Sequence, residues 1–136
     1  MDDCIFCRII RGDIPAAKVY EDADAVAILD IQPANPGHCL ILPKKHFSGL
    51  AETPDADLGG IFAAAKKAAK AAVQAVEADG FNLIVNNGQV AGQVIFHTHI
   101  HVIPRFSDDG HRHWQKREVP EEKMKEIAAK MRQLLA

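Results

Sequence analysis

Three histidines recur at every second position in the segment His97-Thr98-His99-Ile100-His101. Side chains alternate between the two faces of an extended strand, so we expect the three imidazoles to share one face. A neutral imidazole nitrogen can attack phosphorus, and a histidine pKa near ~6.5 leaves most of the ring neutral at pH 7. Such an attack forms a covalent intermediate and divides one difficult displacement into two easier ones.

From the residues alone, two other interpretations of these histidines stay open. Neutral imidazole is a common zinc ligand, so the three side chains could together hold a metal. They could also decorate a half-exposed strand without any chemistry. The regular triple spacing favours a nucleophile whose tautomer is fixed by its histidine neighbours.

The cysteines point to a metal rather than to disulfides. Cys4 and Cys7 have the CxxC spacing that suits a tetrahedral ion, which then needs two further ligands. The alternative is a reduced surface pair or a redox couple. The third cysteine, Cys39, lies in an apolar run and is expected to be a small buried side chain.

Composition narrows the class of protein. The 136 residues, 48% of them apolar and 25% charged, suit one globular domain over residues 1–136. A formal net charge of -2 lacks the basic excess that binding to a nucleic acid polymer needs. No apolar stretch is long enough for a membrane helix, and the N-terminus carries Asp2 and Asp3 where a secretory signal has bases. These features predict a cytoplasmic protein that does not bind membranes.

The histidine segment needs a scaffold to position it, and the pattern predicts an α+β domain because parallel βαβ alternation is absent. Short runs rich in Val, Ile and Leu between turn residues predict an antiparallel meander of strands at 18–21, 25–29 and 38–42, followed by a hairpin of strands at 81–87 and 95–104. Alanine-rich periodicity and Pro/Gly punctuation predict helices at 4–11 with Gly12 as its stop, at 57–79 with Gly80 as its stop, and from Pro120, as first helical residue, to Leu135.

The segment HTHIHVI resembles the motif of the histidine triad family, in its bacterial branch close to the purine nucleoside phosphoramidases. The similarity continues through DIPAAKVYED, LDIQPANPGHCLILPKKH, VNNG and the AGQ that precedes the triad. This resemblance implies a five-stranded antiparallel sheet with a main helix and a C-terminal helix. It also implies a homodimer, which we expect to be built on the alanine-rich segment 61–78 and an adjacent strand.

The resemblance further implies roles for individual residues. The middle histidine, His99, would attack the α-phosphorus of a nucleotide, while His97, His101 and His38 orient it and the phosphate. The expected nucleotide-binding set is Asp30 at the ribose hydroxyls, Asn86, Gly92 and Gln93 along the phosphate, and His99 and His101. A structural zinc would be held by Cys4, Cys7, His46 and His97. Relatives often carry Ser or Thr where this chain has Val94, so that hydroxyl contact is in doubt.

The function implied is hydrolysis of a purine nucleoside 5′-phosphoramidate or an aminoacyl adenylate through a nucleotidyl-histidine. One alternative, cleavage of dinucleoside polyphosphates, uses the same nucleophile and differs only in the leaving group. Another is a non-catalytic nucleotide- or metal-binding adaptor. The late residues His111, His113 and Trp114 are expected in a loop packed by one large aromatic, although C-terminal segments of relatives reach toward the leaving-group side.

Overall fold

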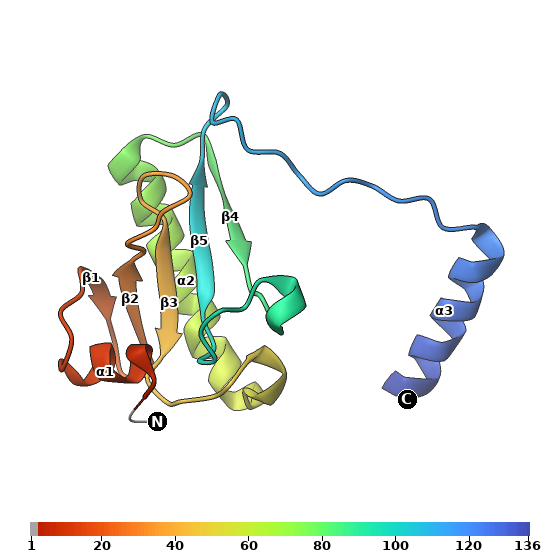
Figure 1. Ribbon diagram of the computed structural model, residues 1–136, viewed down its shortest axis with the longest axis horizontal. Coiled ribbons are helices and arrows are strands. Elements are labelled where there is room, and N and C mark those ends of the chain that lie inside the picture. The colour runs from red at the N-terminus through yellow and green to blue at the C-terminus, as the bar shows by residue number, and fades with distance from the viewer. Residues whose placement is uncertain (1–2) are drawn as a thin grey trace.

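A five-stranded antiparallel sheet is the centre of the computed structural model, which describes residues 3–136 and so leaves Asp2 outside (Figure 1). Its strands run in the order β1-β2-β3-β5-β4 and pair antiparallel throughout. Their bounds are β1 (Lys18–Glu21), β2 (Ala25–Leu29), β3 (Cys39–Pro43), β4 (Gly80–Ile84) and β5 (Ile100–Arg105). The predicted α+β class and antiparallel sheet are confirmed.

The sheet has apolar residues on both faces, and different helices cover them. Helix α2 (Asp55–Val76) packs Ile61 and a row of buried alanines on the face that carries Ile41 and Ile100. On the opposite face, helix α1 (Ile5–Arg11) packs Phe6 and Ile9 among buried residues of β2 and β3. Burying each of those two side chains stabilises the fold by about 1.5–3 kcal/mol. Helices therefore cover both faces of the sheet.

The short first helix forms as the sequence predicts, whereas the main helix ends earlier. Cys4 caps α1, its Sγ accepting from the Cys7 amide at 3.4 Å, and Gly12 ends it in the left-handed region with φ 86°. Helix α2 ends at Val76 because Glu77 adopts φ 54° and turns the chain. The predicted stop at Gly80 is wrong, since Gly80 is already the first residue of β4.

The strands of the predicted hairpin are shorter than expected. β4 ends at Ile84, and β5 begins only at Ile100, so His97 and His99 precede the strand. In that segment the Thr98 amide donates to the Phe47 carbonyl at 2.8 Å instead of joining a sheet ladder. The prediction that the three triad histidines share one strand face is therefore wrong, because only His101 belongs to β5.

The C-terminal helix lies apart from the sheet. Helix α3 (Glu121–Leu135) follows an extended arm that leaves the end of β5 (Figure 1). It begins after Pro120, which occupies the N-cap and not the first helical position that the sequence predicted. None of its residues is buried, and Met124, Ile127 and Met131 form an exposed apolar stripe. Within residues 3–136, no helix is long and apolar enough to cross a membrane.

Candidate active site

A cavity of about 400 Å³ opens between α1, the end of β2 and the triad segment. Its walls are mostly apolar, with a few polar groups that converge from distant parts of the chain. The lining includes Ile5, Phe6 and Ile9 of α1, Leu29 and Asp30 at the end of β2, Asn86, Gly92 and Val94 of the loop after β4, and His99 and His101. An apolar cleft with few polar groups is the usual form of a small-molecule site.

One backbone contact and one side-chain contact assign the hydrogen positions of His38 and His101. The Ala34 amide donates to His38 Nδ1 at 2.9 Å, so the neutral His38 ring carries its proton on Nε2. Burial lowers the pKa of His38 and keeps it neutral at pH 7, although Asp30, whose Oδ2 is 3.5 Å from Nε2, opposes the shift. His38 Nε2 then donates to His101 Nδ1 at 3.0 Å. As a result, His101 presents a protonated Nε2.

The environment of His101 keeps that ring neutral as well. Burial lowers its pKa to about 4, with smaller contributions from the neighbouring imidazoles of His99 and His38. The His99 and His101 ring centroids lie 5.0 Å apart. His101 is therefore a neutral hydrogen-bond donor beside His99.

His99 itself is held through its other nitrogen. Its Nδ1 lies 2.7 Å from the carbonyl oxygen of His97, and only a donor can face a carbonyl, so Nδ1 carries the proton. In the neutral form of the ring, Nε2 is then the nitrogen that has the lone pair. The side chain is 8% exposed and lines the cavity. This is the arrangement that a histidine nucleophile requires.

Asp30, Asn86 and Gly92, which the resemblance assigns to nucleotide binding, also line the cavity. Asp30 Oδ1 accepts from the Gln32 amide at 2.8 Å, so it stabilises a turn and still presents a carboxylate. Gly92 adopts φ 101°, and a Cβ there would meet the Asn86 amide nitrogen at 3.3 Å. Glycine is therefore required for this loop to pass beside Asn86.

Gln93 is buried, and its side chain is used inside the protein. Its Oε1 accepts from the Gly88 amide at 2.9 Å, and its Nε2 donates to the Ser48 carbonyl at 2.8 Å. It is not among the residues that line the cavity. Gln93 thus fixes the glycine-containing loop, and its contact with a nucleotide stays a prediction.

The first triad histidine belongs to a second cluster, with both cysteines of the CxxC and with His46. The four ligand atoms of Cys4, Cys7, His46 and His97 all lie within 4.8 Å of one another. His97 Nε2 donates to the Pro43 carbonyl at 2.9 Å, which leaves its Nδ1 lone pair toward the sulfur atoms. Burial lowers the pKa of His97 to about 4, so the ring is neutral at pH 7.

The spacing within this cluster fits a tetrahedral zinc ion. Bonds of about 2.0–2.3 Å place tetrahedral ligand atoms about 3.3–3.8 Å apart. His97 Nδ1 lies 3.5 Å from Cys4 Sγ, 3.6 Å from Cys7 Sγ and 3.2 Å from His46 Nδ1, and Cys7 Sγ lies 3.3 Å from His46 Nδ1. Within residues 3–136, no group of potential ligands contains all three triad histidines, which argues against a single triad metal.

Comparison with known proteins identifies the family. The model of the HIT domain matches residues 11–108, most of the chain. The chain belongs to the histidine triad (HIT) family. It is 50% identical to an adenylylsulfatase of Arabidopsis thaliana over 79% of this chain and 55% of that protein. It is 39% identical to an adenosine 5′-monophosphoramidase of Schizosaccharomyces pombe over 78% of this chain and 77% of that protein.

A solved structure agrees with the fold. A zinc-bound histidine triad protein from Mycobacterium smegmatis is 38% identical, with a TM-score of 0.78 over 98% of this chain and 96% of that one. The predicted family is therefore confirmed. HIT membership supports a nucleotide hydrolase at the level of the family, without naming the substrate of this chain.

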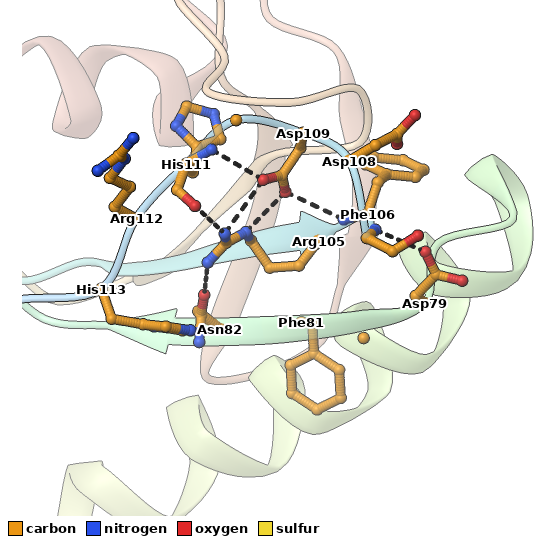
Figure 2. Close-up of a pocket in the computed structure, with 13 residues that line it drawn as sticks. Asp79, Phe81, Asn82, Arg105, Phe106, Asp108, Asp109, His111, Arg112 and His113 are labelled. Atoms are coloured by element: carbon orange, nitrogen blue, oxygen red, sulfur yellow. Dashed lines mark hydrogen bonds and ion pairs between the residues drawn. The ribbon is translucent and has the colours of Figure 1, made fainter.

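This HIT protein has a second hollow, at the root of the C-terminal arm, which supports the site indirectly. Figure 2 shows Arg105 between Asp109 and Asn82, with Arg105 Nε donating to Asp109 Oδ2 at 2.8 Å. That ion pair holds the pKa of Asp109 well below its usual range. Asp109 also accepts from Asn35 at 3.0 Å, and His111 Nε2 donates to the Ala34 carbonyl at 2.9 Å. These contacts hold the turn whose Ala34 amide fixes the tautomer of His38.

His113 also lines the second hollow, whereas Trp114 is 89% exposed in the arm, so the expected loop packed by this aromatic is wrong for the described chain. Sequence reasoning missed the Ala34 amide and the Pro43 carbonyl, since backbone groups have no signature in residue type. It also missed Phe6, for which the adjacent Cys7 was the only signal.

Proposed function

We propose that the chain hydrolyses purine nucleoside 5′-phosphoramidates or aminoacyl adenylates through a nucleotidyl-histidine at His99. The observation that carries this proposal is the 2.7 Å contact between His99 Nδ1 and the His97 carbonyl. It leaves the Nε2 lone pair available at the cavity, where a phosphorus atom can approach it. Two relatives are named adenylylsulfatase and adenosine 5′-monophosphoramidase. Both names imply a leaving group on the α-phosphorus of AMP, which supports the same chemistry.

The reaction takes two balanced steps. His99 Nε2 forms a bond to the α-phosphorus while the bond to the leaving group breaks, and His101 Nε2–H donates a hydrogen bond to the departing nitrogen or oxygen, which takes its proton from water. A water molecule then attacks phosphorus, gives up a proton to the solvent and releases the nucleotide from His99. His38 keeps His101 in this tautomer, because its Nε2–H faces His101 Nδ1.

The remaining cavity residues would bind the nucleotide. Asp30 accepts two hydrogen bonds from the ribose cis-diol, a role for which a carboxylate is suited. Asn86 and the backbone at Gly92 stabilise the charge that develops on the phosphate oxygens. The apolar side chains of α1 supply a wall for the base. Gln93 keeps the loop in place from its buried position.

A structural zinc at Cys4, Cys7, His46 and His97 is part of the proposal. The ligand spacing and the zinc-bound relative support it. When bound, zinc would supply a cross-link among α1, the segment after β3 and the triad, rather than a Lewis acid for the substrate. His97 donates its second nitrogen to Pro43, the kind of outer contact that orients histidine ligands.

We also propose a homodimer formed through α2 and the edge strand β4. Phe62 of α2 and Phe81 and Leu83 of β4 are 41%, 43% and 38% exposed, and β4 is an edge strand of the sheet, so apolar side chains are exposed beside a free strand edge. The uncovered stripe of α3 adds to the apolar surface that a second copy could bury. Sedimentation at micromolar concentration should give twice the chain mass, and a monomeric mass would contradict the dimer.

The same proposal includes one catalytic domain over residues 1–136 and a cytoplasmic location. The three described cysteines are free, and thiols persist in reducing compartments. A location that oxidised Cys4 and Cys7 to a disulfide would contradict this part of the proposal.

Substrate choice is tested by comparing kcat/KM on adenosine phosphoramidate and on diadenosine tetraphosphate. We expect the phosphoramidate to be the better substrate. Acid quench during turnover should trap a nucleotide-sized mass on the peptide that contains His99, and trypsin followed by fragmentation would locate it. Preference for the tetraphosphate would favour a dinucleoside polyphosphate hydrolase, and nucleotide binding without any turnover would favour an adaptor.

A further inference from the structure

Helix α1 lies between the four-ligand cluster and the nucleotide cavity and contributes to both. Cys4 at its N-cap and Cys7 in its first turn point their sulfur atoms at His97. Between them in sequence, Phe6 lines the cavity and is 4% exposed. One short helix therefore carries half of the ligand set and part of the cavity wall.

The ring of Phe6 contacts one histidine of the four-ligand cluster and one histidine of the cavity. Its centroid lies 5.9 Å from that of His97 at an interplanar angle of 88°, and 5.2 Å from that of His99 at 75°. Both are edge-to-face arrangements, which aromatic rings favour. A shift of α1 would break both contacts at once, because in each the Phe6 ring is the partner.

The position of α1 depends on what holds it from outside. A helix of seven residues is too short to be stable by itself in water. Two kinds of contact hold it: the packing of Phe6 and Ile9 on the sheet, and the approach of Cys4 and Cys7 to the two histidines. Without an ion, the second kind consists only of weak sulfur contacts of 3.3–3.6 Å. An ion would turn them into bonds.

A second link runs through His97. Its Nδ1 faces the sulfur atoms, and its own carbonyl oxygen accepts the Nδ1–H of His99. An ion that fixes the His97 ring therefore also restrains the acceptor that orients His99. The two links can be separated experimentally, because Phe6 belongs to only one of them.

We infer that zinc at the four-ligand cluster and a nucleotide in the cavity bind with positive coupling, and that Phe6 is the positioning residue that transmits it. The inference rests on the proposed function only in that the cavity takes a nucleotide. Coupling between two binding sites is reciprocal, so zinc must raise AMP affinity by the factor by which AMP raises zinc affinity. Couplings of this kind are typically about 5- to 150-fold.

The experiment measures AMP affinity by calorimetry on the full chain, first zinc-loaded and then stripped with chelator. A competing chromophoric chelator gives zinc affinity with and without AMP. We expect AMP to bind at least about 5-fold more tightly to the zinc form, and zinc to gain the same factor with AMP. Equal AMP affinity in the two forms would overturn the coupling, whereas absence of AMP binding in either form would contradict the proposed function as well.

The substitution Phe6→Leu tests the route while keeping all four ligands. We expect it to bind one zinc per chain and to weaken AMP binding to the zinc form, so that the coupling factor falls to within about 2-fold of unity. Ile10→Val is the matched control: it trims the same helix, but Ile10 does not line the cavity. Because Phe6 also lines the cavity, the result is decided by the coupling factor and not by AMP affinity alone: if the stripped chain does not stay folded, zinc affinity with and without AMP gives that factor in each variant. Full coupling in Phe6→Leu would assign the transmission to the His97 carbonyl instead.

Discussion

His97 and His99 stand two positions apart, yet their rings face different environments. Each imidazole gives one N–H to a backbone carbonyl, but His97 gives Nε2 to Pro43 and His99 gives Nδ1 to His97. The nitrogen left with a lone pair therefore differs. On His97 it faces two sulfur atoms, and on His99 it is free for the cavity. A backbone acceptor thus decides which chemistry a histidine of this motif can perform.

The largest expected effect separates the two histidines by substitution. His99→Ala should reduce kcat by 10³-fold or more, equivalent to about 4 kcal/mol of barrier, because the covalent route is lost. It should keep bound zinc and bind AMP within a few-fold of the wild type. His97→Ala should lose zinc and retain measurable turnover. Turnover assays, metal analysis and calorimetry on both variants check this, and near wild-type turnover by His99→Ala would refute the proposed mechanism.

The next effect concerns the metal side of the comparison. Cys7→Ala should abolish stoichiometric zinc and lower the free energy of unfolding by at least about 2 kcal/mol, which is about 5 °C or more in Tm for a chain of this size. Burial raises the pKa of the Cys7 thiol, so without an ion the thiol stays protonated and interacts only weakly with the neighbouring side chains. Cys39→Ala, at a buried thiol outside the cluster, is the control for metal content. Unchanged zinc content in Cys7→Ala would exclude this ligand set.

A smaller effect appears as a pH dependence on the cavity side. The folded chain disfavours protonation of His101, whose pKa is lowered from 6.5 to about 4. Above about pH 6.5 both the folded and unfolded forms are neutral here, so stability is unaffected; as pH falls toward 4 the unfolded chain binds the proton first, and stability is lost. Thermal unfolding at steps of pH should show Tm falling over this window. His101→Asn should show a shallower fall, and identical slopes would contradict the assignment.

The smallest effect is expected at Val94, which is 84% exposed and lines the cavity. Val94→Ser introduces a hydroxyl at this position, and one net hydrogen bond is worth about 0.5–1.5 kcal/mol. We expect kcat/KM on adenosine phosphoramidate to rise by about 2- to 10-fold with zinc content unchanged. Val94→Ala, which shortens the side chain without adding a hydroxyl, is the matched control. An equal response in both variants would exclude a hydroxyl contact.

Much of the scaffold could be predicted from residue types, because local signals decide it. The bounds of β1 and β2 follow the runs of apolar residues between acidic turns, and Gly12 marks the end of α1. The strand order β1-β2-β3-β5-β4 could not be predicted, since it depends on long-range pairing. The end of α2 at Glu77 was missed because a left-handed glutamate is rare.

At the site, the residue types were predictable and their arrangement was not. Alternation at His97, His99 and His101 is typical of a strand, but the contact of Thr98 with Phe47 keeps the first two out of β5. Gln93 was assigned to phosphate contact by its place in the motif, whereas the bonds it makes with Gly88 and Ser48 are visible only in three dimensions. Backbone acceptors, which decide the tautomers, have no signal in sequence.

The charge of the cavity wall determines how strongly nucleotide affinity should depend on ionic strength. Among the described residues that line it, Asp30 is the only one with a formal charge, and neither lysine nor arginine is present. A bound phosphate would then accept hydrogen bonds from the N–H of a neutral imidazole, from a side-chain amide and from backbone groups, and not from exposed lysine or arginine side chains. Added salt screens exposed charge pairs strongly and short contacts in a buried cleft much less. Nucleotide affinity should therefore change little between dilute buffer and physiological or higher salt.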